Sequence, residues 1–443
     1  MKDHNRQFAN LGLEIPAILL PSGVDLQKWA VIACDQFTQD RDYWTNVKNI
    51  AGDAPSTLNL IFPEVFLADG NEKQTITNIH KSMKTYLDNG IFGAPQNGFV
   101  YIERDTPLNK KRRGLVAALD LEQYDWKPDA RPLIRCTEGT VMERLPPRMD
   151  IRRGAPLETP HVLLLIDDDS DSLLNELGAR AKKAAPLYET QLMMGSGSIS
   201  GWLLNGEDDL AFLAAKLAEL SSRSISRYSA GAGSNGLPFL FAVGDGNHSL
   251  AAAKGIWEEY KAAHANGGAL VEHPCRYALV EIENIYDPAI QFEPIHRIVF
   301  GLDMEGAVSI LSALPGFSIK PVKDREELVR LCNEPCNGNR FGIVYKNSYA
   351  LVQTSAQGIS TASLQPLLDK NLEPAYIDYI HGEEEVFRLA LMTDNKTTGI
   401  LLPPFNKAGL FETIARLGPL PRKSFSMGMA EEKRFYMECR SLF

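Results

Sequence analysis

The segment Gly-Asp-Gly-Asn-His-Ser, residues 244–249, carries the strongest chemical signal in the sequence. It follows an apolar run at 237–243 that predicts a buried strand, and it precedes a pattern of apolar residues at helical spacing. The free N–H groups and the positive dipole end at the start of a helix attract anions, and phosphate is the natural ligand. The turn therefore predicts a phosphate site that involves Gly246, Asn247 and Ser249. A tight turn in which one of these side chains only caps the helix is the competing interpretation.

Two further side chains of this turn carry groups that suit catalysis. Asp245 is expected to hold a cation or a substrate hydroxyl, because carboxylate oxygens are preferred ligands of Mg²⁺. His248 is expected to donate to a phosphate oxygen or to shuttle a proton, since histidine titrates near neutral pH. The segment lacks the spacing of a Walker loop and the full glycine pattern of a dinucleotide-binding fold. The local sequence therefore predicts an anion site without identifying a known nucleotide-binding loop.

An arginine-rich segment at 131–153 predicts a second part of an anion site. It contains six arginines and no lysine, within a chain that is acidic overall. Arginine grips phosphate and carboxylate groups with two parallel hydrogen bonds, so Arg135 and Arg148 are candidate phosphate ligands. Glu138 lies among these arginines as a candidate base, metal ligand or ion-pair partner. The alternative is a solvated pair of strands with surface salt bridges, which contribute little to stability.

Four other residues are weaker candidates for the same site. Asp35 ends an apolar stretch at 29–34, and ligands of open α/β sheets bind where strands end. It is a second candidate base, and the residues alone do not separate it from the glutamate of the arginine-rich segment. His296 and Arg297 begin a predicted strand, and together with Lys423 they are candidate phosphate contacts. A helix cap, a structural histidine and an exposed lysine are the competing interpretations.

Strand patterns alternate with helix patterns along nearly the whole chain, which predicts an α/β fold with mixed α+β character. The clearest helix signal covers 72–89, and a Ser/Gly-rich stretch at 223–236 is expected to be a loop. Residues 301–357 are expected to form a small α+β insertion. The main α/β catalytic body is then expected to comprise 1–300 and 358–443.

Composition and charge exclude several classes of protein. Lys and Arg number 46 against 56 Asp and Glu, and the formal net charge of −10 disfavours binding to nucleic acid. No apolar run approaches the roughly 18 residues that a membrane helix needs, so no membrane association is expected. The six cysteines form no Cys-x-x-Cys pair, which indicates reduced thiols in a cytoplasmic protein without a secretory signal.

Four separated motifs, in this order along the chain, resemble the bacterial and archaeal family called domain of unknown function 1015. They are TEGTVMERLPPR at 137–148, GDGNHSLAAAK at 244–254, EPIHRIVF at 293–300 and LPRKSFSMG at 420–428. The resemblance runs from about Ala17 to Ser441 and so covers almost the whole chain. It implies a body similar to the ParB/sulfiredoxin fold, in a superfamily that includes kinases of free serine.

The resemblance also implies roles for individual residues. In the turn that the family has as Asp-Gly-His-His-Arg, Asp245, Gly246 and His248 match, while Asn247 and Ser249 replace a histidine and an arginine. The remaining matches are Asp35 after the first strand, then Arg135, Thr137 and Glu138, then Pro294, His296 and Arg297, and finally Lys423. The replaced arginine indicates that the chain belongs to a divergent subgroup.

For function, the resemblance implies a phosphotransferase that moves a phosphate from ATP or ADP to a small hydroxyl metabolite. Free L-serine, which would give O-phosphoserine, is the first candidate acceptor. Mg²⁺ is expected to bridge the nucleotide phosphates with help from Asp245. The expected partners are thus a nucleotide and a small molecule, and a homodimer stays open. Two alternatives also stay open: a non-catalytic nucleotide sensor that binds a partner, and a hydrolase of small phosphoesters.

Overall fold

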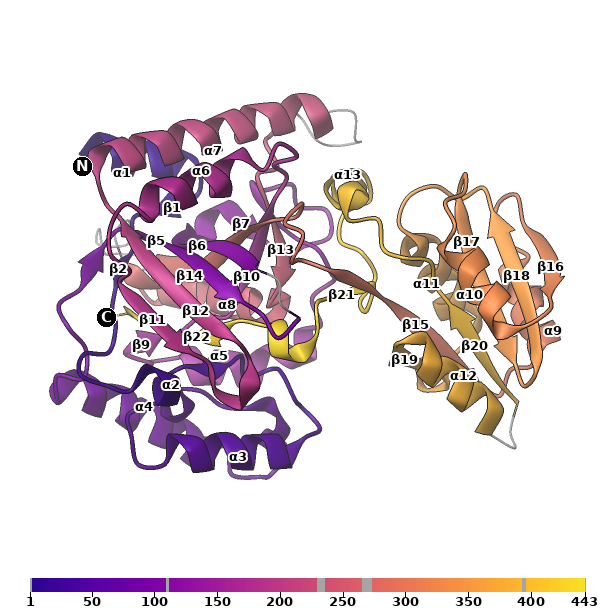
Figure 1. Cartoon of the computed structure of the whole chain (residues 1–443), viewed down its shortest axis with the longest axis horizontal. Helices are drawn as coiled ribbons and strands as arrows, with labels where there is room; N and C mark the ends of the chain where they lie inside the picture. Colours follow the sequence, from indigo (N-terminus) through magenta and orange to yellow (C-terminus); the bar gives the residue numbers. More distant parts are fainter. Residues whose placement is uncertain (1, 109–110, 229–235, 265–272, 393–395, 443) are drawn as a thin grey trace. The chain divides into compact units, whose positions relative to one another are not determined.

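The computed structural model describes residues 2–108, 111–228, 236–264, 273–392 and 396–442. Within these residues the chain forms two compact units (Figure 1). The first unit comprises 1–290 and 429–443, and the second comprises 291–428. The second unit is larger than the 301–357 insertion expected from the sequence, because strands on both sides of that segment belong to the same sheet as the strands within it.

The first unit is built on a ten-stranded mixed sheet. Its main path has the order β11-β12-β5-β6-β14-β10-β13-β8-β7, and β1 (Leu13–Glu14) pairs with β6. The bounds along this path are β11 Tyr188–Gln191, β12 Ser198–Leu204, β5 Phe99–Asp105, β6 Lys111–Asp120, β14 Tyr277–Asn284, β10 Leu163–Ile166, β13 Phe241–Asp245, β8 Ile134–Cys136 and β7 Tyr124–Asp125. Parallel pairing of β10 with β14 and of β8 with β13 and β7, beside antiparallel pairs elsewhere, confirms the predicted mixed α/β class.

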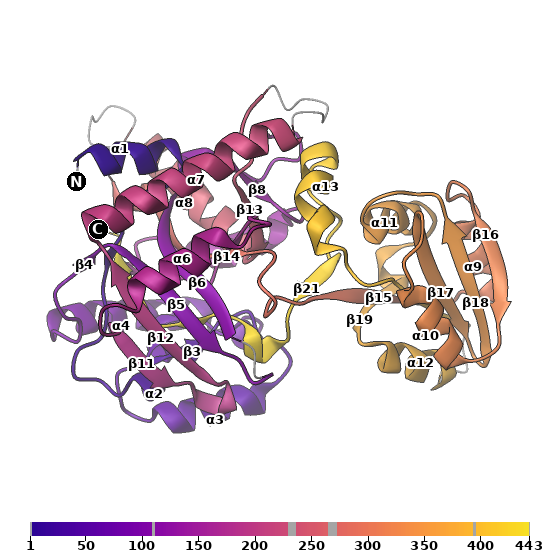
Figure 2. The same ribbon diagram turned by 45° about the horizontal axis from the view of Figure 1, so that its top comes forward.

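Helices cover both sides of this sheet (Figures 1 and 2). Helices α6 (Ser172–Ala181) and α7 (Glu207–Tyr228) lie along one side, and α3 (Arg41–Ala51) and α4 (Glu72–Asp88) lie on the other. The apolar stripe of α4 buries Ile79, Met83 and Tyr86, as its helical spacing requires. The helix predicted over 72–89 is thereby confirmed.

Helix α7 extends into the stretch that was expected to be a loop. Leu220, Ser224 and Tyr228 continue the helical spacing of its buried face, so the helix persists to Tyr228. The Ser/Gly composition of this stretch is therefore compatible with a helix as long as one face stays buried. Residues 229–235 of the expected loop lie outside the described residues.

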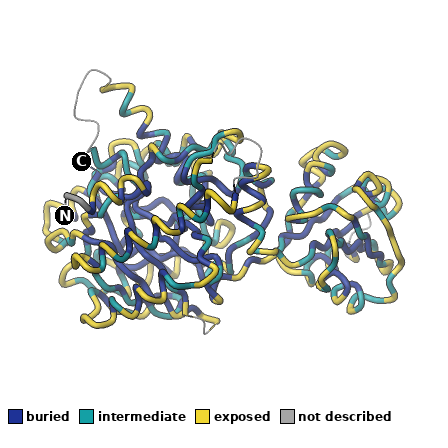
Figure 3. The backbone as a smooth tube through the Cα atoms, turned by 90° about the horizontal axis from the view of Figure 1, so that it is seen from above, coloured by how far each residue is buried: buried dark blue, intermediate teal, exposed yellow. Residues whose placement is uncertain are grey.

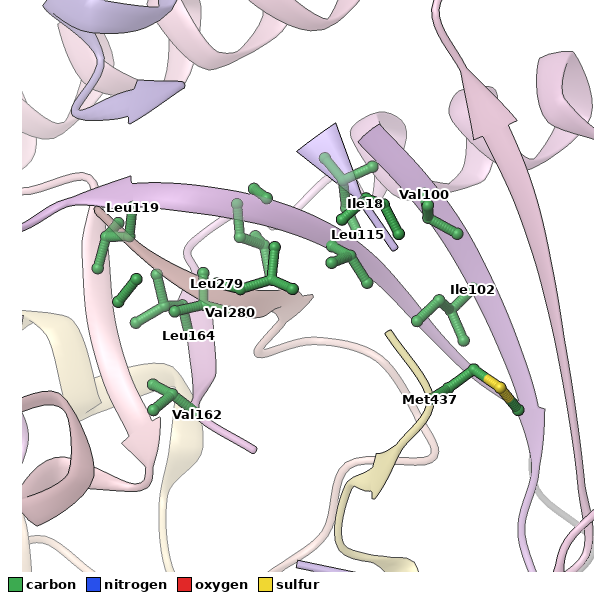
Figure 4. Packing of buried hydrophobic residues seen from close by; sticks show 14 of the residues in the cluster. Ile18, Val100, Ile102, Leu115, Leu119, Val162, Leu164, Leu279, Val280 and Met437 are labelled. Atoms are coloured by element: carbon green, nitrogen blue, oxygen red, sulfur yellow. The ribbon is translucent and has the colours of Figure 1, made fainter. Parts of the chain in front are cut away.

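The C-terminal segment runs through the interior of the first unit. Strand β22 (Phe435–Tyr436) pairs with β3 (Val31–Ile32), and β23 (Arg440–Ser441) pairs with β9 (Leu157–Glu158). Between them, Met437 is fully buried in the same apolar cluster as strands β5 and β6 (Figure 4). Figure 3 shows how burial is distributed in this unit: the central strands are buried, and the outer parts of the helices are exposed. The described residues of this segment are thus part of the core.

A buried ionic network fixes this segment to the sheet. Arg434 is 2% exposed and forms ion pairs with Glu281 of β14 and with Glu438, whose Oε2 lies 2.5 Å from Arg434 Nη2. Arg104 of β5 donates to the backbone carbonyl of Glu432 at 2.8 Å. Buried charges are tolerated only when partners of opposite charge and hydrogen bonds satisfy them. The network therefore holds the residues around Arg434 in one position.

The second unit is a seven-stranded antiparallel sheet with helices packed on it. The path is β16-β18-β17-β20-β15-β19, and β21 pairs with β15. The strands are β15 Phe292–Phe300, β16 Ser318–Val322, β17 Asn339–Tyr345, β18 Ser348–Thr354, β19 Ile377–His381, β20 Thr397–Leu401 and β21 Phe425–Met427. The helices are α9 Met304–Leu311, α10 Arg325–Asn333, α11 Ser360–Asn371, α12 Glu383–Met392 and α13 Leu410–Leu417. Strands β17 and β18 form an antiparallel hairpin.

The helices and the cysteines of the described residues bear on two sequence-based expectations. In the part of the chain that the structure describes, no helix is long and apolar enough to cross a membrane. All six cysteines are free thiols, and four of them are buried.

Replacement of Arg434 by Met is expected to destabilise the first unit by about 3–5 kcal/mol, because Glu281 and Glu438 would remain buried without their cation. Urea denaturation followed by tryptophan fluorescence measures the loss, since all five tryptophans lie in the first unit. A matched control is Lys84→Met, which breaks an exposed ion pair with Asp88 and should change the free energy of unfolding little. Equal stability of the two variants would contradict the role assigned to the network.

Candidate functional site

The site is centred on the start of helix α8 (Asn247–Ala263), which follows β13 after a single residue. That residue, Gly246, has φ +80°, and a Cβ there would lie 3.1 Å from Cα and Cγ2 of Val162. Glycine is therefore required by both backbone conformation and space. No side chain caps the helix at Gly246, so its first N–H groups are not used by a capping group. The predicted order of strand, turn and helix is present, but β13 ends at Asp245 and α8 begins at Asn247, so most of the segment expected to be a turn belongs to the strand or the helix.

Asp245, the last residue of β13, is paired with a lysine from the C-terminal segment. Its Oδ2 lies 2.8 Å from Nζ of Lys433, and its Oδ1 accepts the N–H of Gly246 at 3.0 Å. The side chain of Lys433 is 9% exposed, so this is a nearly buried pair. Burial alone raises the pKa of Asp245, but the Lys433 ammonium outweighs burial, and the pKa lies below its usual range. Asp245 is therefore ionised at neutral pH beside a fixed positive charge.

His248, in the first turn of α8, is held as a neutral imidazole. Burial lowers its pKa to about 4, with further lowering by the charges of Arg148 and Arg144 and a smaller opposing effect of Asp35. Its Nε2 accepts the backbone N–H of Val141 at 3.1 Å. With Nε2 accepting, the ring proton sits on Nδ1. His248 can therefore donate a hydrogen bond to an anion without carrying a charge.

A second histidine, His161, joins three elements at the same place. Its Nε2 lies 3.0 Å from Oγ of Ser249 and 3.5 Å from Oδ2 of Asp35, and its Nδ1 lies 2.7 Å from the hydroxyl of Tyr436. The backbone N–H of Cys34 donates to the same tyrosine hydroxyl at 3.1 Å. The contacts bring Asp35 and Ser249, both predicted from the sequence, to one imidazole.

An arginine and a glutamate complete the charged surroundings. Arg148, on α5 (Leu145–Arg152), forms an ion pair with Glu64, and its Nη1 donates to the carbonyl of Arg144 at 2.8 Å. Burial raises the pKa of Glu64; Arg148 opposes this effect and Asp35 adds to it. Arg148 therefore lies near His248 and Glu64, and its charge is shared with Glu64.

Three residues of this cluster have no strong sequence signal. His161 precedes β10 as a single histidine, Glu64 begins a single 3-10 turn at Glu64–Phe66, and Lys433 is one of two lysines near the C-terminus. Each is far in sequence from its partner, at separations of 88 for His161 and Ser249 and 188 for Lys433 and Asp245. Pro160 before His161, at the edge of an apolar run, is the one local signal that could have marked it as a strand-end residue.

Other residues predicted from the sequence have partners outside this cluster. The guanidinium of Arg135 stacks on the Phe239 ring at 4.4 Å, and its Nε donates to the carbonyl of Pro132 at 3.1 Å. Burial lowers the pKa of Arg135 to about 10. Arg135 thus turns back towards the start of β8 and does not contact Asp245 or His248 through these bonds.

Asn247 and Glu138 lie at the junction of β8 and α8. The Asn247 side chain accepts the N–H of Thr137 at 3.2 Å and donates to the hydroxyl of the same threonine. Asn247 therefore joins the helix start to strand β8 and does not cap the helix, so its backbone N–H is the group that it offers to an anion. Glu138 is half-buried. It is the residue after Thr137, which bonds to Asn247 at the start of α8.

The three predicted phosphate contacts of the second unit form a structural cluster within that unit. The guanidinium of Arg297 is fully buried and donates to Oε1 of Gln365 at 2.8 Å and to the carbonyl of Lys423 at 3.1 Å. His296 Nδ1 accepts the N–H of Leu402 at 3.0 Å, and burial lowers the pKa of this histidine to about 4. The Lys423 side chain is exposed. These hydrogen bonds hold strands and loops of the second unit together, so His296 and Arg297 have a structural role there.

A resident magnesium ion at Asp245 does not fit this geometry. Lys433 already neutralises Asp245 Oδ2, and Gly246 occupies Oδ1, so the carboxylate has a cation in place. Among the described residues, no group of three or more His, Cys, Asp or Glu side chains is arranged to hold a metal. The metal-ligand role predicted for Asp245 therefore conflicts with its pairing, and any magnesium would depend on the oxygens of a bound nucleotide.

Comparison with known proteins identifies the family. The chain belongs to the family described as "Protein of unknown function (DUF1015)", which matches residues 19–371 and confirms the resemblance seen in the motifs. No curated protein matches the chain.

Three solved structures share low similarity with the chain. A conserved hypothetical protein from Pyrococcus furiosus is 11% identical, with 74% of this chain and 97% of that chain covered and a TM-score of 0.34. A free serine kinase in complex with AMP is 11% identical, with 73% and 90% covered and a TM-score of 0.36. SbnI with a C-terminal truncation, from Staphylococcus aureus, is 7% identical, with 72% and 85% covered and a TM-score of 0.35. TM-scores this low give no basis for transferring a ligand or an activity.

The neutral state of His248 gives a direct prediction. In an NMR titration, the Cε1–H resonance of His248 is expected to stay constant from pH 8 to pH 6 and to shift with a midpoint at about pH 4. Arg148→Gln removes one of the charges that lower this pKa, so the midpoint should rise. The control is Arg153→Gln, which removes an exposed arginine at the end of helix α5, the helix that carries Arg148. It should leave the titration midpoint of His248 unchanged. A wild-type midpoint between pH 6 and 7 would contradict the neutral donor.

Proposed function

We propose that the protein is a phosphotransferase that moves a phosphate from ATP, or from ADP, to the hydroxyl of a small metabolite. The observation that carries this proposal is the meeting of Asp35, the neutral donor His248 and the Lys433–Asp245 pair around the start of helix α8. Phosphoryl transfer depends mainly on positioning and on neutralising charge, and these groups supply both. Free L-serine is the first acceptor to test, on the strength of the family resemblance.

The phosphate groups would bind at the start of α8. The first N–H groups of the helix and its positive dipole end favour an anion there. Lys433, held by Asp245, and Arg148, held by Glu64, add N–H donors next to this end, and the charge of each is partly neutralised by its carboxylate partner. His248 would donate from Nδ1 to the transferring phosphoryl group, in the manner of a preorganised oxyanion donor.

Asp35 is the proposed base that takes the proton of the acceptor hydroxyl. Its Oδ2 faces His161 at 3.5 Å, and its Oδ1 accepts from the side chain of Gln36 at 2.9 Å. Its charge also acts on His248 and on Glu64, so it lies among the groups that surround the phosphate position. Glu138 was the rival base in the sequence, and the contacts of Asp35 favour the aspartate.

Magnesium enters this proposal with the nucleotide. ATP in cells carries Mg²⁺ on its phosphates, and protein sites for such ions often add only one or two carboxylates. Glu64 is paired with Arg148 and Asp245 with Lys433, whereas the contact of Asp35 with His161 is longer, at 3.5 Å. The metal would therefore be part of the substrate, and the groups of this chain would bind the phosphates directly. A ParB/sulfiredoxin-like body and a homodimer likewise stay predictions from the resemblance.

The test is phosphorus NMR of ATP and Mg²⁺ with L-serine, followed by a panel of hydroxy acids and amino alcohols. The wild-type protein is expected to produce a phosphomonoester of one acceptor. His248→Ala should lower kcat by roughly 10²–10³-fold if it removes one oxyanion donor. Asp35→Asn should lower it by roughly 10²–10⁴-fold if it removes the base.

Glu138→Gln is the matched comparison for Asp35→Asn, because both remove one carboxylate charge at the site. A larger loss for Glu138→Gln would contradict the choice of base while leaving phosphoryl transfer intact. Release of inorganic phosphate without a phosphorylated acceptor would indicate the phosphoester hydrolase instead. Binding of nucleotide without any turnover would indicate the nucleotide sensor.

A further inference from the structure

Ser249 and His161 form a pair that the mechanism above does not use. The serine hydroxyl lies 3.0 Å from Nε2 of His161, within hydrogen-bond distance. His161 also lies close to Asp35. The two residues of the pair belong to different elements, since Ser249 is in the first turn of α8 and His161 precedes β10. A hydroxyl within reach of an imidazole nitrogen is the arrangement by which enzymes activate a serine nucleophile. The pair is therefore a candidate for covalent chemistry.

The other side of the imidazole supports a base at Nε2. The Tyr436 hydroxyl lies 2.7 Å from Nδ1, and the two rings meet edge to face with an interplanar angle of 82°. When Nδ1 carries the ring proton and donates it to Tyr436, the lone pair of Nε2 faces Ser249. Tyr436 is itself fixed by the N–H of Cys34 and by pairing of β22 with β3. The ring orientation thus depends on buried groups.

The groups around the pair stabilise the charges that form when the hydroxyl proton moves from Ser249 to His161. Asp35 Oδ2, at 3.5 Å from Nε2, stabilises the imidazolium that forms when the ring takes a proton. The positive end of α8 stabilises negative charge on a side chain in its first turn. These two effects act in the same direction, which is transfer of the hydroxyl proton to His161.

We infer that Ser249 is a nucleophile that accepts the phosphoryl group before the metabolite does, with His161 as its base. The inference rests on the proposed function and makes the transfer a two-step reaction. In the first step, Ser249 Oγ forms a bond to the γ-phosphorus of ATP, and the bond from that phosphorus to the β–γ bridging oxygen breaks. ADP leaves with the electron pair, and the hydroxyl proton moves to Nε2 of His161.

In the second step, the hydroxyl of the metabolite attacks the same phosphorus. Its proton moves to Asp35, the bond between phosphorus and Ser249 Oγ breaks, and the serine oxygen regains its proton from His161. Once Asp35 has released its proton to solvent, the protein is back in its starting state, and the phosphate is on the acceptor. Asp35 and His161 thus act on different hydroxyl groups in different steps, which accounts for both being present at 3.5 Å from each other.

The test uses two phosphorus electrophiles on the full-length protein without acceptor. The first is ATP with Mg²⁺, quenched in acid and analysed by intact mass and peptide mapping for a phosphate on Ser249. The second is a fluorophosphonate, which needs no nucleotide site and loses fluoride when a serine oxygen attacks its phosphorus. Both are expected to modify Ser249. Ser249→Ala should abolish the modification, and His161→Gln should slow it at least about 10²-fold.

Ser360→Ala, at the first residue of helix α11 in the second unit, is the control and should leave the modification of Ser249 unchanged. Modification by the fluorophosphonate alone would mean that Ser249 is activated but takes no phosphoryl group from ATP, which overturns the inference and leaves the proposed function standing if a phosphorylated metabolite still forms. Formation of a phosphorylated metabolite with no adduct from either electrophile overturns the inference and leaves the proposed function standing. Absence of any adduct and of any product overturns both.

Discussion

The buried ion pairs of Arg434 hold the C-terminal segment in the middle of the first unit. Arg434 bridges Glu281 of β14 and Glu438, and it is 2% exposed, so it has no solvent to compensate for a lost partner. Lys433 and Tyr436 lie one residue before and two residues after it. Their contacts with Asp245 and with His161 follow from this fixed position. The candidate site thus depends on an interaction that lies outside it.

Charge pairing divides the groups of the site into two kinds. Asp245 is neutralised by Lys433, and Glu64 is neutralised by Arg148, so these four residues set the local field. Burial keeps His248 neutral, with a pKa of about 4, and leaves its Nδ1–H as a donor. Asp35 has the longer contact, 3.5 Å to His161. A carboxylate held without a short ion pair, beside a neutral donor and a fixed cation, suits proton transfer more than structural support.

The sequence was informative where a feature is local and less so where it depends on tertiary packing. The order of strand, glycine turn and helix around Asp245–Ser249 was predictable, because the apolar spacing and the glycine that specify it lie close together in the sequence. His161 and Lys433 were missed, since their partners lie 88 and 188 residues away. Arg297 belonged to a motif that matched the family, but its burial and its bond to Gln365 give it a structural role that residue type alone does not reveal.

The central claim is that the start of helix α8 binds the phosphates of a nucleotide next to Lys433 and His248. A crystal structure with Mg²⁺ and a non-hydrolysable ATP analogue tests it most directly. We predict phosphate oxygens within hydrogen-bond distance of the backbone N–H groups of 247–249, with Lys433 Nζ and His248 Nδ1 among their donors. A nucleotide bound elsewhere, with this helix start in contact with solvent alone, would contradict the claim.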